Sequence, residues 1–236
     1  MDKTIEQLTG AERIRRRPAV VFGDAGLDGS KRVFTELVRL LLPEVSRGFC
    51  TRVDIALYKN GTIALKTNGR GFYIGENDQK WKDIFAELPF KSYFDVPHGE
   101  QAFSLYEESG LTTKEERYYY DDLSLVCCQS VCQYMDCIIF RGGREHNLHF
   151  EQGVPKSKES SVCDQGKQGM QISFLIDPSV FNKQHILPTE FVVAIAQTAA
   201  TRLPGLLVSV KAENNDGWVE HIFGTECKVG SREENK

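Results

Sequence analysis

Two short segments of the sequence carry residue types that could do chemistry together. Glu36 lies on a stretch of helical periodicity, and a carboxylate there could take part in acid–base work. The turn Asn68-Gly69-Arg70-Gly71 interrupts the second strand of a predicted hairpin further along the chain. A lone glutamate on a helix is more often a solvated side chain. The spacing of the two segments must therefore decide whether they form the two halves of one ligand site.

Other reactive residue types point to structural roles. The five histidines show no zinc-ligand spacing with the cysteines. Four of the seven cysteines crowd residues 127–137, an apolar stretch, which indicates small buried side chains in a reducing cytoplasm. The run Tyr118-Tyr119-Tyr120 could stack on bases or form a protein contact. The adjacent Asp121 and Asp122 make nucleic acid the less favoured partner.

Composition favours one folded domain. The chain has 236 residues, 41% of them hydrophobic, and a net charge of −4. Such a chain can bury a core, and its mild acidity argues against a dedicated nucleic-acid binder despite the basic run at residues 13–17. No apolar run approaches the roughly 18 residues of a membrane span, and the N-terminus lacks the apolar core of a signal peptide. We therefore expect a cytoplasmic protein.

Periodicity predicts a mixed set of helices and hairpins. Ser30 is a candidate N-cap of the helix predicted at 29–48. Pro43 lies inside that helix and predicts a kink or an early stop. The turns Asn60-Gly61 and Gly142-Gly143 each join two predicted strands. We expect long loops at 89–120 and 155–166 and a charged tail at 227–236. The predicted helices span 5–16, 29–48, 80–88, 123–135 and 189–202, and the predicted strands span 53–57, 63–65, 137–140, 147–150, 170–176, 206–210 and 218–223.

This order predicts an α/β fold, an α+β two-layer sandwich in which helices cover one face of a mixed, mostly antiparallel sheet. Several segments, taken in order, resemble the N-terminal ATP-binding domain of the type IIA DNA topoisomerase B subunit, which has the Bergerat, or GHKL, fold. The resemblance is carried by segments 8–18, 21–24, 36–38, 68–71, 150–155 and 169–174.

The resemblance implies roles for residues that match the family pattern. It places Glu36 as general base for the water that attacks the γ-phosphate of ATP. Glu44 and Arg70 match an ion pair beside the nucleotide pocket, and Arg141 matches an arginine at the pocket edge. Gly69 and Gly71 are kept, while Phe72 replaces the isoleucine that follows in the family.

Three departures fall on groups that hold the nucleotide in the family. Leu40 stands where an asparagine binds Mg²⁺, and a leucine side chain has no lone pair for a hard cation. Thr67 replaces the aspartate that accepts a hydrogen bond from the adenine amino group. A neutral hydroxyl there gives a weaker hydrogen bond than a carboxylate. Met170 replaces the threonine that supports that aspartate.

A fourth departure is the phosphate lid, which is glycine-rich in the family. Glycines there let backbone N–H groups close on phosphate at a helix N-terminus. The aligned run, Tyr118 to Asp122, contains no glycine and ends in two aspartates that would repel a triphosphate. We therefore expect weak or absent binding of ATP and Mg²⁺ and no resident metal.

Two hypotheses of function follow from the resemblance. The first is a stand-alone domain, spanning residues 1–226 with a lid-like mobile region at 89–120, that has weak or lost ATPase activity and acts as a binding or regulatory module. The second is a competent ATP-hydrolysing domain of a divergent or truncated topoisomerase subunit. The family's transducer and DNA-cleavage domains are not expected in this chain. We expect a protein partner rather than direct DNA binding, and a monomer is favoured.

Overall fold

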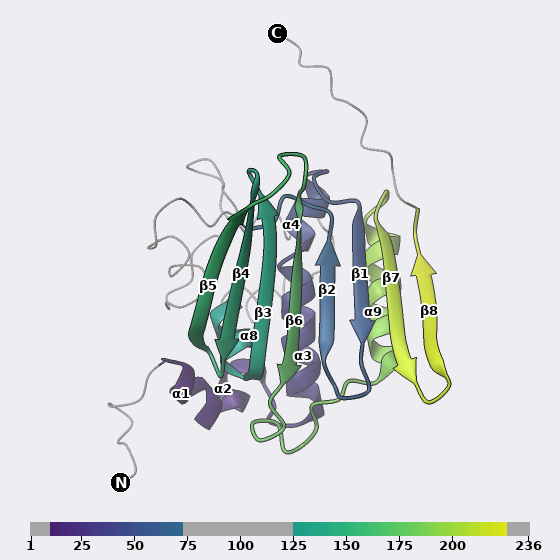
Figure 1. The fold of residues 1–236 in the computed structure, drawn as a ribbon. Coiled ribbons are helices and arrows are strands. Elements are labelled where there is room, and N and C mark those ends of the chain that lie inside the picture. Colours follow the sequence, from purple (N-terminus) through teal and green to yellow (C-terminus); the bar gives the residue numbers. More distant parts are fainter. Residues whose placement is uncertain (1–9, 73–124, 226–236) are drawn as a thin grey trace.

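The computed structural model describes residues 10–72 and 125–225 (Figure 1). The predicted helix at 80–88, the loop at 89–120, the lid residues and the charged tail lie outside these ranges. The helices are α1 (Gly10–Arg16), α2 (Pro18–Phe22), α3 (Leu27–Arg39), α4 (Leu42–Ser46), α8 (Leu125–Ser130) and α9 (Thr189–Arg202). The strands are β1 (Arg52–Leu57), β2 (Ile63–Thr67), β3 (Cys132–Arg141), β4 (Arg144–Glu151), β5 (Val154–Val162), β6 (Gly169–Ile176), β7 (Leu207–Asn214) and β8 (Gly217–Phe223).

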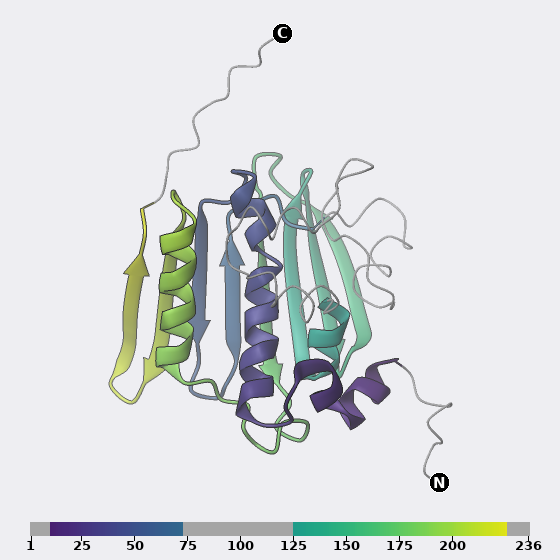
Figure 2. The same ribbon diagram turned by 180° about the vertical axis from the view of Figure 1, so that it is seen from behind.

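The described strands form one sheet in the order β5-β4-β3-β6-β2-β1-β7-β8. Adjacent strands pair antiparallel except β1 and β7, which run parallel. Helices α3, α4, α8 and α9 cover one face of the sheet, while the other face carries no helix in the described part of the chain (Figures 1 and 2). The predicted two-layer α/β architecture with a mixed, mostly antiparallel sheet is confirmed.

The core lies between α3, α9 and the covered face of the sheet. Strands β1 and β2 alternate buried and more exposed residues, as half-buried strands should. Helix α3 buries Val33, Phe34 and Leu37 completely. The cysteines at 127, 128, 132 and 137 are all buried in this core, as predicted. No helix among the described residues is long and apolar enough to cross a membrane.

The long helix predicted at 29–48 is two helices. The first begins earlier, at Leu27, and ends at Arg39, before the short helix α4 that contains Pro43. The stop before Pro43 agrees with proline's exclusion from helix interiors. Ser30 is not the N-cap. It lies inside α3, where its hydroxyl donates to the carbonyl oxygen of Gln184 at 2.6 Å, and Gly26 takes the capping position.

Two other predictions were wrong. The predicted helix at 123–135 ends at Ser130, and β3 begins at Cys132, because a wholly buried apolar run suits either a helix or a central strand. The predicted loop at 155–166 is largely strand β5. This strand lies at the sheet edge and is mostly exposed, so its sequence lacks an apolar alternation, and its lysines and proline are typical of protected edges.

Candidate functional site

Glu44 and Arg70 form a bidentate ion pair between α4 and the turn after β2. Arg70 Nη2 lies 2.7 Å from Glu44 Oε1, and Arg70 Nε lies 3.1 Å from Glu44 Oε2. The Arg70 backbone N–H also donates to Glu44 Oε2 at 3.0 Å. The Glu44 residue is only 4% exposed, and the guanidinium stacks 3.6 Å from the centroid of the Phe49 ring. The ion pair implied by the resemblance is thus present and fixes the turn against α4.

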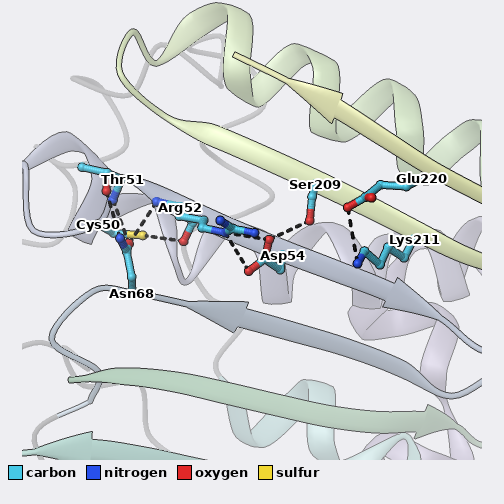
Figure 3. A network of polar contacts seen from close by, with 8 residues as sticks. All are labelled: Cys50, Thr51, Arg52, Asp54, Asn68, Ser209, Lys211 and Glu220. Atoms are coloured by element: carbon cyan, nitrogen blue, oxygen red, sulfur yellow. Dashed lines mark hydrogen bonds and ion pairs between the residues drawn. The ribbon is translucent and has the colours of Figure 1, made fainter. Parts of the chain in front are cut away.

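Asn68 anchors the same turn to the start of β1. Its Oδ1 accepts hydrogen bonds from the backbone N–H groups of Thr51 and Arg52, each at 2.9 Å. Its Nδ2 donates to Thr51 Oγ1 at 2.9 Å (Figure 3). Neighbouring Cys50 is buried, and burial raises the pKa of its thiol to about 11. Asn68 belongs to the turn motif seen in the sequence, but no local pattern indicates its anchoring role.

Gly69 and Gly71 both lie in close packing, and Gly71 leaves the least room for a side chain. A Cβ at Gly69 would lie 3.1 Å from the Cβ of Cys50. Gly71 has a φ of +71°, and a Cβ there would lie 2.9 Å from Ile139 Cγ2. The Gly71 carbonyl accepts a hydrogen bond from Arg141 Nη1 at 2.8 Å. The turn therefore lies directly against β3.

Glu36 lies on α3 and is 3% exposed. Its Oε1 is 3.4 Å from Arg39 Nη1 and 3.5 Å from Arg32 Nε. Both arginines come from the same helix, at i+3 and i−4, the spacings at which helical side chains meet. These two residues were not predicted as site members, although their spacing from Glu36 was a readable signal.

Glu36 also lies close to α8. Burial raises the pKa of the Cys128 thiol well above its ordinary value, and the negative charge of Glu36 adds to this shift. Cys128 is fully buried, so it acts as a small apolar side chain between α3 and α8. Helix α8 begins at Leu125, just after the lid residues Tyr118 to Asp122, which fall outside the described ranges.

The three substituted positions form part of the core. Leu40 is 4% exposed and follows α3, where its N–H bonds to the carbonyl of Glu36. Thr67 on β2 and Met170 on β6 are direct cross-strand partners, 7% and 4% exposed. The register therefore places these two residues side by side. Phe72, next to the turn, is completely buried.

The structure therefore brings most of the predicted residues to one region, the end of β2 and the adjoining helices. It joins Arg70 to Glu44, Arg141 to Gly71, and Thr67 to Met170. No group of three or more histidine, cysteine or acidic side chains among residues 10–72 and 125–225 is arranged to hold a metal ion.

No family model matches the chain, but individual relatives do. It is 24% identical over 181 residues to the B subunit of DNA gyrase from Chlamydia pneumoniae, covering 75% of this chain and 22% of that protein. It is 27% identical over 203 residues to the DNA gyrase B subunit of Treponema denticola, covering 84% and 28%.

The match to the DNA gyrase B subunit of Thermotoga maritima is 22% identical over 216 residues, covering 91% of this chain and 31% of that protein. The chain thus spans less than a third of the length of these curated relatives. With its mostly antiparallel sheet covered by helices on one face, the chain is distantly similar to the DNA gyrase B subunit, in agreement with the resemblance of its sequence to the N-terminal ATP-binding domain of that protein.

Proposed function

We propose that this chain is a gyrase-B-like domain whose nucleotide site binds and hydrolyses ATP weakly or not at all, and that it acts as a binding or regulatory module. The observation that carries the proposal is the environment of Glu36. A general base must be able to reach a water molecule and accept its proton. The Glu36 carboxylate is buried, and two guanidinium groups approach the same oxygen at 3.4 and 3.5 Å.

The residues at the positions that the resemblance assigns to metal and adenine binding fit magnesium triphosphate poorly. Mg²⁺ requires oxygen ligands in near-octahedral geometry. Leu40, one helical turn after Glu36, offers a buried aliphatic side chain where the resemblance implies a metal ligand. The Thr67–Met170 pair offers one neutral hydroxyl and a thioether where the resemblance implies a carboxylate and its supporting hydroxyl. No catalytic step is therefore assigned to a metal–nucleotide complex here.

The geometry around Arg70 has a structural explanation under this proposal. The bidentate pair with Glu44, the stacking on Phe49 and the hydrogen bonds of Asn68 fix the turn between β1, β2 and α4. These contacts maintain the fold without a bound nucleotide. The second hypothesis, a competent ATP-binding domain, accounts for the same contacts equally well, because such a domain also needs this scaffold.

A phosphate-release assay on the purified chain separates the two hypotheses. We expect no ATP turnover above a buffer control with the unmodified chain. Leu40→Asn and Thr67→Asp, made together, restore oxygen donors at the two positions, and Glu36→Gln in that background tests the base. Turnover by the unmodified chain that disappears with Glu36→Gln alone would establish the competent domain instead.

The proposal also covers the binding partner, the cellular location and the oligomeric state. We propose a protein partner rather than DNA, which the net charge of −4 supports. A cytoplasmic location is supported by the six described cysteines, which are all free thiols. A monomer remains the favoured state, and size-exclusion chromatography with light scattering would test it at several protein concentrations.

A further inference from the structure

The uncovered face of the sheet contains a hollow that the proposed nucleotide site does not involve. Its volume is about 260 Å³, and residues of β1, β2, β6 and β7 line it. This volume approaches the lower end of ordinary ligand pockets, about 300 Å³. Along β1 the lining residues Asp54 and Ala56 alternate with residues buried against the helices, so they point to the other face of the sheet. The helices lie behind the sheet in the view of Figure 1, and the hollow therefore opens on the side away from α3.

The strand register explains why the surface is hollow here. Ala56 on β1 and Ala64 on β2 are direct cross-strand partners and form a floor of two methyl groups. The next pair on the same face is Asp54 with Lys66, which raises a wall on one side. Tyr58 forms the wall on the other side. Its ring meets Trp218 edge to face, with centroids 5.3 Å apart, which restricts its orientation.

The single carboxylate in the lining is already compensated. Both oxygens of Asp54 lie 3.0 Å from Arg52 Nε, and the Ser209 hydroxyl donates to Asp54 Oδ1 at 2.6 Å (Figure 3). Lys66 is the register partner of Asp54 but forms no ion pair within the described part of the chain. Its ammonium group is therefore available to an incoming anion.

Lys211 contributes a second available cation. Its Nζ lies 3.5 Å from Glu220 Oε1, and both side chains are about half exposed (Figure 3). An exposed pair of this kind contributes little free energy, so an anion can compete for Lys211. Strand β1 separates β2 from β7, and the register partners of Lys66 and Lys211 on β1, Asp54 and Ala56, are two residues apart. The backbones of the two lysines are therefore roughly 12 Å apart. Two long side chains can reach a small anion between them from both sides.

We propose that this hollow binds a small organic anion that carries a carboxylate or phosphate group on a flat apolar body. The charged group binds between Lys66 and Lys211. The body lies on Ala56 and Ala64 against the Tyr58 ring. Apart from the Arg52–Asp54 ion pair, the lining holds two cations, Lys66 and Lys211, and Glu220 offsets only one of them. The site is therefore locally positive in a chain whose net charge is −4.

NMR titration of the whole chain tests this site. Phenyl phosphate and benzoate are the two organic probes, and inorganic phosphate is the probe without a flat body. Lys66→Met removes the charge and keeps the apolar stem. Ala64→Leu fills the floor. Lys156→Met, on the distant edge strand β5, is the matched control for loss of one exposed lysine.

The expected result is saturable shifts of the backbone amide signals of residues 54–58 and 64–66 with phenyl phosphate, benzoate or both. Lys66→Met should weaken that binding by about two- to fivefold, the effect of one lost exposed charge contact. Ala64→Leu should abolish it, and Lys156→Met should leave it unchanged. The tighter organic probe identifies the charged group.

Three results would overturn the proposal: no saturable shift at these strands with either organic probe, binding that survives Lys66→Met undiminished, or inorganic phosphate binding as tightly as phenyl phosphate. Far-UV circular dichroism of each variant verifies folding. Because Lys66 is exposed, its variant keeps the test decisive even if Ala64→Leu fails to fold. ATP affinity is measured separately, so failure here leaves the proposed function standing.

Discussion

Arg70 reaches Glu44 through both its guanidinium and its backbone N–H, so one buried carboxylate ties the turn after β2 to helix α4. The pair joins elements separated by strands β1 and β2 in the sequence. A buried carboxylate that accepts hydrogen bonds from three donor groups is costly to disrupt, because the partner is left unpaired.

Glu44→Gln should destabilise the chain by about 1–3 kcal/mol, since the neutral amide cannot satisfy the guanidinium and the backbone N–H together. Chemical denaturation followed by circular dichroism measures this. Asp28→Asn is the matched control, because it removes the carboxylate of an exposed i,i+3 pair with Lys31. That change should cost less than about 1 kcal/mol. Equal losses in the two variants would show that the buried pair has no special role.

Gly71→Ala should cost more stability than Gly142→Ala. Both glycines have positive φ, +71° and +61°, so both substitutions strain the backbone by about 1–3 kcal/mol. A Cβ at Gly142 meets nothing within 4 Å, whereas a Cβ at Gly71 lies 2.9 Å from Ile139 Cγ2 and 3.0 Å from the Gly169 carbonyl. The comparison of unfolding midpoints isolates the steric part. A Gly71→Ala variant as stable as Gly142→Ala would contradict the close packing of this turn against β3 and β6.

The stabilisation that ionised Asp177 gives to the folded chain should be lost in acid. Burial opposes ionisation of Asp177, but hydrogen bonds from Ser179 and Arg15 outweigh it, so the net pKa is lowered. Because the folded pKa lies below the unfolded one, this stabilisation is present above the unfolded pKa and is lost as pH falls through the folded pKa. Asp177→Asn should flatten the loss of unfolding free energy between about pH 4 and pH 2. An unchanged acid limb would exclude Asp177 as its source.

His149 should titrate above an ordinary histidine. The hydrogen bond from its Nδ1 to Asp136 at 2.6 Å is the main cause of the raised pKa, and Glu151 adds to it. Stabilisation by the charged form is therefore full below the unfolded pKa and disappears as pH rises through the folded pKa. The effect on stability should be small, because both partners are substantially exposed. NMR titration of the imidazole should show a lower pKa in Asp136→Asn, and no change would contradict the contact.

Helices and strands were predictable where apolar residues recur with a clear period. They were not predictable where every residue of a segment is buried or where nearly every residue is exposed. The boundaries of α9 were predicted to the residue, and the hairpin turns at Asn60-Gly61 and Gly142-Gly143 were correct. The run containing Val131 is buried on every side, so a helix and a strand give the same apolar signal there. Strand β5 is exposed nearly throughout, and edge strands carry little apolar pattern.

Only some of the contacts around the candidate site were predictable from the sequence. The family resemblance alone was enough to pair Glu44 with Arg70. The roles of Asn68, Arg32 and Arg39 depend on side-chain geometry, although the helical spacing of the two arginines from Glu36 was visible in the sequence. The hollow on the uncovered face of the sheet depends on which residues of neighbouring strands lie opposite each other. That register cannot be read from the sequence before the strand pairing is known.

The proposed loss of magnesium triphosphate binding around Glu36 and Leu40 underlies the proposed function. Isothermal titration calorimetry of the chain with ATP, with and without Mg²⁺, measures that binding without any intermediate step. We expect no saturable heat with ATP at micromolar concentrations, and no gain on adding Mg²⁺, because Leu40 provides no metal ligand. A micromolar dissociation constant that depends on Mg²⁺ would show instead that the site still holds its nucleotide.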